Sequence, residues 1–192
     1  MTDFSRASAN MVHAQLQTNG ITDSRVIDAY LQTPRETYVT GALAGRAYLD
    51  DDVRLPGTQR WLLEPLVEAR LMQAALTGRV DRALVLGAAS VPTIAVLASF
   101  AQVVTVLEPS HDLALAAATV LAGFKNVGFI ETSLREGYPR QAPYDVIFAT
   151  GALAHVSSGL TSQLAEGGLL VAVVRSSPHA VGRVTMVRAC AG

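Results

Sequence analysis

The chain has 192 residues, a length that suits one domain with a substantial hydrophobic core. Half of its residues are hydrophobic and only 16% are charged, which excludes an intrinsically disordered chain. The net charge of −1 argues against a nucleic-acid partner, because non-specific binding to nucleic acid needs a basic surface. The one cysteine, Cys190, excludes an intramolecular disulfide and is consistent with a reducing compartment.

Neither a leader nor a membrane span is expected. Residues 1–6 lack the basic stretch and apolar run of a secretory signal. Residues 83–107 carry no charge and are numerous enough to cross a bilayer. However, Gly87, Pro92 and the β-branched run 103–106 divide this stretch into strand, helix and strand. We therefore expect a cytoplasmic protein without a membrane partner.

The first sixty residues are predicted to be mainly helical. Apolar residues at helical spacing, before and after a stop at Asn19-Gly20, predict two short helices. Thr22 or Asp23 is a suitable N-cap for the second helix, and Pro34 ends it. The apolar positions are Met11, Leu16, Val26, Ile27 and Tyr30.

A loop follows at residues 50–57, and then a longer helix is expected from about Leu62 to Leu76. From Arg82 onward, strands alternate with helices of about ten residues, a pattern that predicts an α/β fold with a doubly wound, mostly parallel sheet. The predicted strands are Ala83–Leu86, Val103–Leu107, Val127–Ile130, Asp145–Thr150, Leu169–Arg175 and Arg183–Arg188. The predicted helices are Pro92–Phe100, Asp112–Ala122 and about Gly159–Leu164.

The turn after the first predicted strand is the most informative segment. In nucleotide-binding folds a glycine-rich turn here lets backbone N–H groups approach the ligand closely. In this chain only Gly87 remains, with Ala89 and Val91 at the next two glycine positions. A positive φ at Val91 would cost about 1–2 kcal/mol. Losing two hydrogen bonds to a polar ligand, at about 1.5–3 kcal/mol each, would lower its affinity roughly 100- to 10,000-fold. A plain turn that binds nothing is the alternative.

Glu108 ends the second predicted strand, about 20 residues after Gly87. At this offset an acidic side chain meets the ribose hydroxyls of a bound nucleotide; the alternative is a solvated carboxylate at a strand end. His13, His111, His155, His179 and Cys190 show no metal-ligand spacing, so no metal site is predicted. No nucleophile elbow or catalytic triad is evident, and no catalytic residue is assigned.

Seven short motifs together resemble the protein-L-isoaspartate O-methyltransferase family, within the class I S-adenosylmethionine-dependent methyltransferase fold, and specifically a divergent bacterial branch. They follow the family's order over most of the chain. The most specific are a PRE-x-(F/Y)-V stretch and an APYD-x-I stretch. The matching segments are Met11–Leu16, Gly20–Asp23, Arg25–Ala29, Pro34–Val39, Ala47–Asp50, Ala142–Ile147 and Gln163–Gly168.

The resemblance implies S-adenosylmethionine as the cofactor, bound weakly or not at all because the turn is eroded. Its cofactor-binding residues would be Gly87, Ala88, Ala89 and Glu108, with Ser133 or Glu131 at the adenine. Val85 stands where the family has an acidic residue before the first glycine.

The substrate side also departs from the family. Its T-I-S-x-P turn aligns on Pro65, which places Leu63 at the serine position. Thr58 is a substitute hydroxyl if the loop shifts, and Trp61 and Leu62 are expected to pack into the core or against a partner. His155 is expected to be a loop residue, and Asp145 to stabilise a turn before the fourth strand.

Three functions remain open at this point. The first is methyl transfer from S-adenosylmethionine to an abnormal aspartyl carboxylate in a protein or peptide substrate. The second is a catalytically inactive relative that acts as a binding or assembly module, and the third is a methyltransferase for a different acceptor.

Residues 1–192 are expected to form a single domain, with a helical, substrate-side part at 1–80 and a cofactor-binding-type α/β core at 81–192. The family's fold ends in an antiparallel hairpin of two strands, and this chain has residues for only one of them. This difference indicates a truncated C-terminus or a short sheet with an exposed edge strand. With a mean hydropathy of +0.31, that edge favours a homodimer.

Overall fold

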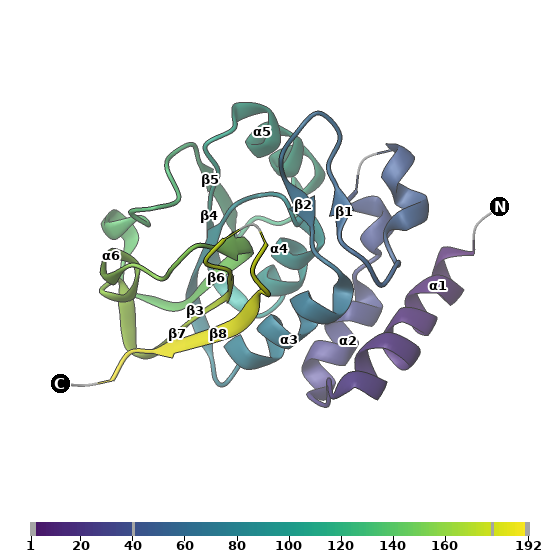
Figure 1. Cartoon of the computed structure of the whole chain (residues 1–192), viewed down its shortest axis with the longest axis horizontal. Coiled ribbons are helices and arrows are strands. Elements are labelled where there is room, and N and C mark those ends of the chain that lie inside the picture. Colours follow the sequence, from purple (N-terminus) through teal and green to yellow (C-terminus); the bar gives the residue numbers. More distant parts are fainter. Residues whose placement is uncertain (1–2, 40, 178, 191–192) are drawn as a thin grey trace.

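A six-stranded sheet forms the centre of the molecule (Figure 1). The computed structural model describes residues 3–39, 41–177 and 179–190. The strand order is β5-β4-β3-β6-β7-β8, with every neighbouring pair parallel except β7 and β8. This arrangement confirms the predicted α/β fold. The strands are β3 Val80–Leu86, β4 Ala101–Leu107, β5 Val127–Ile130, β6 Tyr144–Leu153, β7 Leu164–Val174 and β8 Arg183–Arg188.

The two faces of the sheet bury different side chains because successive residues of a strand point to opposite faces. On β3, Val85 packs into a core shared with α3, α4 and α5, whereas Leu84 and Leu86 pack into a second core with α6. The helices are α3 Pro65–Ala75, α4 Val91–Ala98, α5 His111–Val120 and α6 Ser158–Thr161.

β3 and β6 both begin before the first residue predicted for them. Asp145, at the start of β6, accepts hydrogen bonds from the backbone N–H groups of Asp81 and Arg82, both at 2.8 Å. These bonds tie the first residues of β3 to β6, and Val80 pairs with Ala101 of β4, so β3 begins at Val80 instead of Ala83. Asp145 therefore joins two strands, whereas a turn was expected.

The N-terminal region contains both predicted helices. The first begins as α1 Phe4–Asn10, continues through a π-helical turn at Met11–Leu16 and a 3-10 turn at Gln17–Asn19, and stops at Gly20, which has a φ of 88°. The second is α2 Ser24–Gln32. Its N-cap is Asp23, whose side chain accepts the N–H of Arg25 at 2.9 Å.

The segment between the N-terminal helices and the sheet differs from the prediction. Two 3-10 turns, Arg35–Thr37 and Gly41–Arg46, precede a small antiparallel hairpin of β1 Val53–Arg54 and β2 Trp61–Leu62. The prediction that the next helix begins near Leu62 is wrong, because that residue belongs to β2. α3 begins at Pro65, a residue suited to the first turn because it has no N–H to leave unbonded.

A buried ion pair connects the N-terminal part to α3. The Arg35 Nη1 and Glu68 Oε2 atoms lie 2.6 Å apart, and both side chains are 1% exposed. Arg35 also donates from Nε to the carbonyl oxygen of Ala47 at 2.9 Å, and Ser90 donates its hydroxyl to Glu68. Among the described residues, no helix is both long and apolar enough to cross a membrane.

Candidate active site

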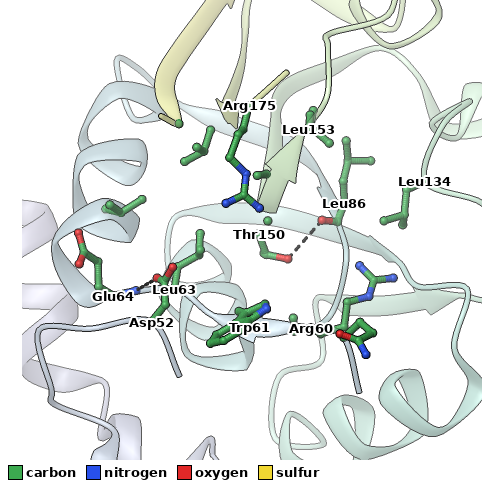
Figure 2. Close-up of a pocket in the computed structure, with 17 residues that line it drawn as sticks. Asp52, Arg60, Trp61, Leu63, Glu64, Leu86, Leu134, Thr150, Leu153 and Arg175 are labelled. Atoms are coloured by element: carbon green, nitrogen blue, oxygen red, sulfur yellow. Dashed lines mark hydrogen bonds between the residues drawn. The ribbon is translucent and has the colours of Figure 1, made fainter. Parts of the chain in front are cut away.

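A pocket of about 700 Å³ opens at the carboxyl ends of β3, β6 and β7. Ligands of open α/β sheets bind at this edge. The β1–β2 hairpin and the start of α3 form the facing wall (Figure 2). The residues that line it are Asp52, Gln59, Arg60, Trp61, Leu63, Glu64, Val67, Leu86, Ala89, Leu134, Thr150, Gly151, Ala152, Leu153, Val173, Arg175 and Gly182.

Gly87 makes the sharp turn that the sequence predicts at the end of β3. Its φ is +96°, and a Cβ atom there would lie 3.0 Å from the Thr150 Oγ1 atom. Its N–H donates to the carbonyl oxygen of Leu107 at 2.9 Å, and its own carbonyl oxygen accepts the Thr150 hydroxyl at 2.9 Å. Any side chain at this position would be both strained and crowded.

The rest of the turn is relaxed. Ala88 and Ala89 are buried, and Ala89 lines the pocket. Val91 is the first residue of α4, and no non-glycine residue in the described part of the chain has a positive φ. The strain considered for Val91 is therefore not present, because the turn is completed by Gly87 alone.

Glu108 is fully buried directly after β4 and is bound on both carboxylate oxygens. Oε2 accepts the N–H of Ala88 at 2.9 Å, while Oε1 accepts the N–H of Ser110 at 3.0 Å and the Arg60 Nη2 group at 3.2 Å. The alternative of a solvated carboxylate is wrong. Glu108 instead fixes the loop after β4 against the turn after β3.

Arg60 lies over the turn that would approach a cofactor. It reaches from the β1–β2 hairpin, and its Nη1 atom would lie 3.7 Å from a Cβ on Gly87. A carboxylate has about four acceptor positions, so the three donors on Glu108 leave about one for a ribose hydroxyl. Glu108 beside Gly87 can therefore accept a hydrogen bond from a ribose hydroxyl once the Arg60 side chain, which is 34% exposed, moves outward.

The two candidates for the adenine lie outside the pocket lining. Ser133 is exposed, and its hydroxyl oxygen accepts the N–H of Arg135 at 3.3 Å within a turn. Glu131 is also exposed and pairs with His111, with 2.7 Å between Oε1 and Nδ1. Leu134, which directly follows Ser133, does line the pocket. Their role in cofactor binding stays a prediction.

The wall formed by the β1–β2 hairpin and the start of α3 carries both apolar and polar side chains. Leu63 lines the pocket at the position where a hydroxyl was sought. Leu62 is buried, as expected. Trp61 is 48% exposed and lines the pocket, so it does not pack into the core, and its packing against a partner stays a prediction. Thr58 is occupied within the hairpin, where it donates to the carbonyl oxygen of Leu55 at 3.0 Å and accepts the N–H of Arg60 at 3.0 Å.

Two acids border the same wall. The Asp52 carboxylate accepts the N–H of Glu64 at 2.9 Å, which holds the aspartate run against the start of α3. Burial, together with the nearby Asp50, Asp52 and Asp51, raises the pKa of Glu64 above its usual range. His155 is exposed and does not line the pocket, and the described residues contain no cluster of side chains that could hold a metal ion.

Three pocket residues, Arg60, Thr150 and Arg175, were not predicted from the sequence. Thr150 is the last residue of the strand predicted at Asp145–Thr150. A polar residue at the carboxyl end of a central parallel strand could have indicated the site. Arg175 directly follows β7 and carried the same signal. Arg60 carried none, because its role depends on a hairpin that brings it to Glu108.

The sheet order, the pocket at its carboxyl edge and the buried acid after β4 are those of a class I methyltransferase fold. A family model of protein-L-isoaspartate(D-aspartate) O-methyltransferase matches residues 7–187. The chain belongs to this family.

Named relatives agree with the family match. The protein-L-isoaspartate O-methyltransferase of Chromohalobacter salexigens is 36% identical over 97% of this chain and 81% of its own length. Protein-L-isoaspartate O-methyltransferase 1 of Pelobacter propionicus is 37% identical over 88% of this chain and 80% of its own.

Solved structures show the same fold. A solved protein-L-isoaspartate O-methyltransferase superposes with a TM-score of 0.81 at 22% identity, over 95% of this chain and 60% of that chain. A Plasmodium falciparum structure with the same enzyme name, in complex with S-adenosyl-L-homocysteine, gives a TM-score of 0.73 at 18% identity, over 98% of this chain and 94% of that one.

Proposed function

We propose that this protein transfers a methyl group from S-adenosylmethionine to an abnormal aspartyl carboxylate in protein or peptide substrates. The observation that carries the proposal is that Glu108 binds the N–H of Ala88 in the turn that Gly87 begins, next to a pocket of about 700 Å³ that Leu86 and Ala89 of the same segment line. Membership of the isoaspartate O-methyltransferase family supports the choice of both cofactor and acceptor.

Gly87 and Glu108 would hold the ribose side of the cofactor, and Ala88 and Ala89 would face it. The cofactor supplies an already activated methyl group, so that the protein needs little acid–base chemistry of its own. The task of the remaining pocket is to align the acceptor and exclude water. The apolar surfaces of Trp61, Leu63 and Val173 suit that task.

We further propose that the cofactor binds more weakly than an open site would allow. The Arg60 contact with Glu108 must break before a ribose can reach the carboxylate, and Val85 is buried in the core with no polar group to add. A partly exposed ion pair contributes on the order of 1 kcal/mol, which corresponds to roughly a five-fold loss of affinity. The inactive binding module is therefore the second candidate, and the closed Arg60–Glu108 pair is the observation that favours it.

Thermal unfolding with S-adenosylmethionine or S-adenosyl-L-homocysteine tests the cofactor first. Ligand at about 100 times its dissociation constant should stabilise the fold by about 2.7 kcal/mol. No shift at millimolar ligand would refute both methyltransferase candidates and leave the binding module. Where a shift occurs, transfer of a labelled methyl group to an isoaspartyl peptide, compared with the matched aspartyl peptide, decides whether the acceptor is an abnormal aspartyl residue.

We also propose a homodimer in which β8 forms part of the interface. β8 is the outermost strand on its side of the described sheet, and Val184 and Met186 on it are 48% and 52% exposed. Light scattering over a range of concentrations checks the proposal. A monomer at every concentration would contradict it.

A further inference from the structure

The pocket contains two arginine side chains whose surroundings differ. Arg60 donates to the buried carboxylate of Glu108 at 3.2 Å. Arg175 also lines the pocket, but its guanidinium makes no hydrogen bond or ion pair with the part of the chain that the structure describes. Within the described pocket, the positive charge of Arg175 is therefore available to a ligand.

The main chain fixes where Arg175 projects. It directly follows β7, and its backbone N–H donates to the carbonyl oxygen of Leu153 at 2.8 Å, which attaches it to the end of β6. Figure 2 shows its side chain extending into the pocket from this end of the sheet, across from the wall that carries Leu63 and Glu64. The base of the side chain is thus anchored, while its guanidinium can adjust to a bound group.

The side chains of Thr150, Leu63, Asp52 and Glu64, which also line the pocket, are less suited than Arg175 to bind an anion. The Thr150 hydroxyl already donates to the carbonyl oxygen of Gly87 at 2.9 Å, and Leu63 has no donor. Asp52 and Glu64 repel an anion on their own side of the pocket, so they direct a negatively charged ligand toward the opposite wall. A guanidinium presents parallel N–H donors that match the two oxygens of a carboxylate.

We propose that Arg175 binds the carboxylate of the methyl acceptor and selects acceptors with a free carboxylate, an assignment that rests on the proposed function. One physical consequence follows for the reaction cycle. Transfer of the methyl group from the sulfonium sulfur of S-adenosylmethionine to a carboxylate oxygen leaves S-adenosyl-L-homocysteine and a neutral ester, so the contact that holds the substrate weakens once the product has formed. Arg175 then contributes to both acceptor selection and product release.

Peptide binding to the full chain tests this assignment without requiring turnover. The probes are an isoaspartyl peptide and a matched peptide whose free carboxylate is replaced by a carboxamide. Titration calorimetry compares wild type with Arg175→Gln, Arg175→Lys and Arg140→Gln. Arg140 is the control because it is also an exposed arginine but lies in the Pro139–Gln141 turn before β6, away from the pocket lining.

Wild type should prefer the free carboxylate by roughly ten-fold or more, the usual effect of one charge-assisted hydrogen-bond pair. Arg175→Gln should lose this preference, while Arg175→Lys should keep part of it because the charge remains. Arg140→Gln should behave as wild type. The same variants are examined for a thermal shift with S-adenosyl-L-homocysteine, which should be equal in all of them.

The outcomes separate the two proposals. Equal binding of both peptides by wild type, or an unchanged preference in Arg175→Gln, overturns the role of Arg175 while the proposed function stands. A wild type that binds neither peptide overturns both. Loss of the thermal shift in Arg175→Gln alone assigns the residue to the cofactor and also overturns the assignment to the acceptor.

Discussion

Arg60 lies against Glu108, the residue that we propose holds the ribose of the cofactor. Its guanidinium lies 3.2 Å from Glu108 and would lie 3.7 Å from a Cβ on Gly87. The Glu108 carboxylate is fully buried, so the ion pair stabilises the fold while it obstructs the position proposed for the ribose. Folding stability and cofactor affinity are therefore expected to change in opposite directions when this side chain is removed.

Arg60→Gln should tighten S-adenosyl-L-homocysteine roughly five-fold, because the ligand no longer displaces a cation. It should also lower the free energy of unfolding by about 1–3 kcal/mol, because Glu108 loses a charged partner. Calorimetric titration measures the first effect and urea unfolding the second. Arg140→Gln, which removes the same charge at an exposed turn, is the matched control. Weaker ligand binding by Arg60→Gln would show that Arg60 holds the ligand instead of blocking it.

Among the elements, β6 is fixed at both of its ends by side-chain contacts. At its carboxyl end Thr150 bonds Gly87, and at its start the Tyr144 hydroxyl donates to the carbonyl oxygen of Tyr138 at 2.7 Å. Burial, and to a smaller extent the neighbouring Tyr138, raises the pKa of Tyr144 from 10.0 to about 12. The start of the strand is therefore sensitive to alkaline pH.

The sign of this sensitivity follows from the pKa of Tyr144, which is higher in the folded state than in the unfolded state. Its contribution to stability is fully present below pH 10 and is lost as the pH rises from 10 through about 12. Urea unfolding across this window should show a decline that is smaller in Tyr144→Phe than in wild type. Tyr138→Phe keeps the backbone oxygen that accepts the Tyr144 bond and removes only the smaller contribution of Tyr138, so its decline should stay close to that of wild type. An equal decline in wild type and Tyr144→Phe would contradict the assignment.

The sheet was predictable from the sequence because its strands are continuous apolar runs between turns, and β5 and β8 have the predicted bounds. Gly87 and Glu108 were also predictable, since a strand-to-helix turn and the acid about 20 residues later have a fixed spacing. The β1–β2 hairpin was not, because its strands are only two residues long and are defined by their pairing. Arg60 could not be assigned to the site for the same reason, and the partner of Glu108 was missed with it.

At the scale of the whole molecule, one hydrophobic core joins the N-terminal helices to the sheet. It includes Met11 and Tyr30 from the first part of the chain and Val85, Val104 and Phe148 from the strands. The Arg35–Glu68 ion pair lies beside this core. Through Ser90, which donates to Glu68, the pair reaches the turn between β3 and α4. Packing of the N-terminal part is thereby connected to the geometry of the candidate cofactor turn.

Arg35→Met should lower the free energy of unfolding by about 3–5 kcal/mol, because it leaves the Glu68 carboxylate buried without its cation. The double variant Arg35→Met with Glu68→Gln should recover a large part of that loss, since it removes the buried charge and keeps an acceptor for Ser90. Urea unfolding measures both variants against Arg46→Met, which removes an exposed arginine from the same region. If the double variant is less stable than Arg35→Met alone, desolvation of Glu68 is not the origin of the loss, and the two residues contribute to the core independently.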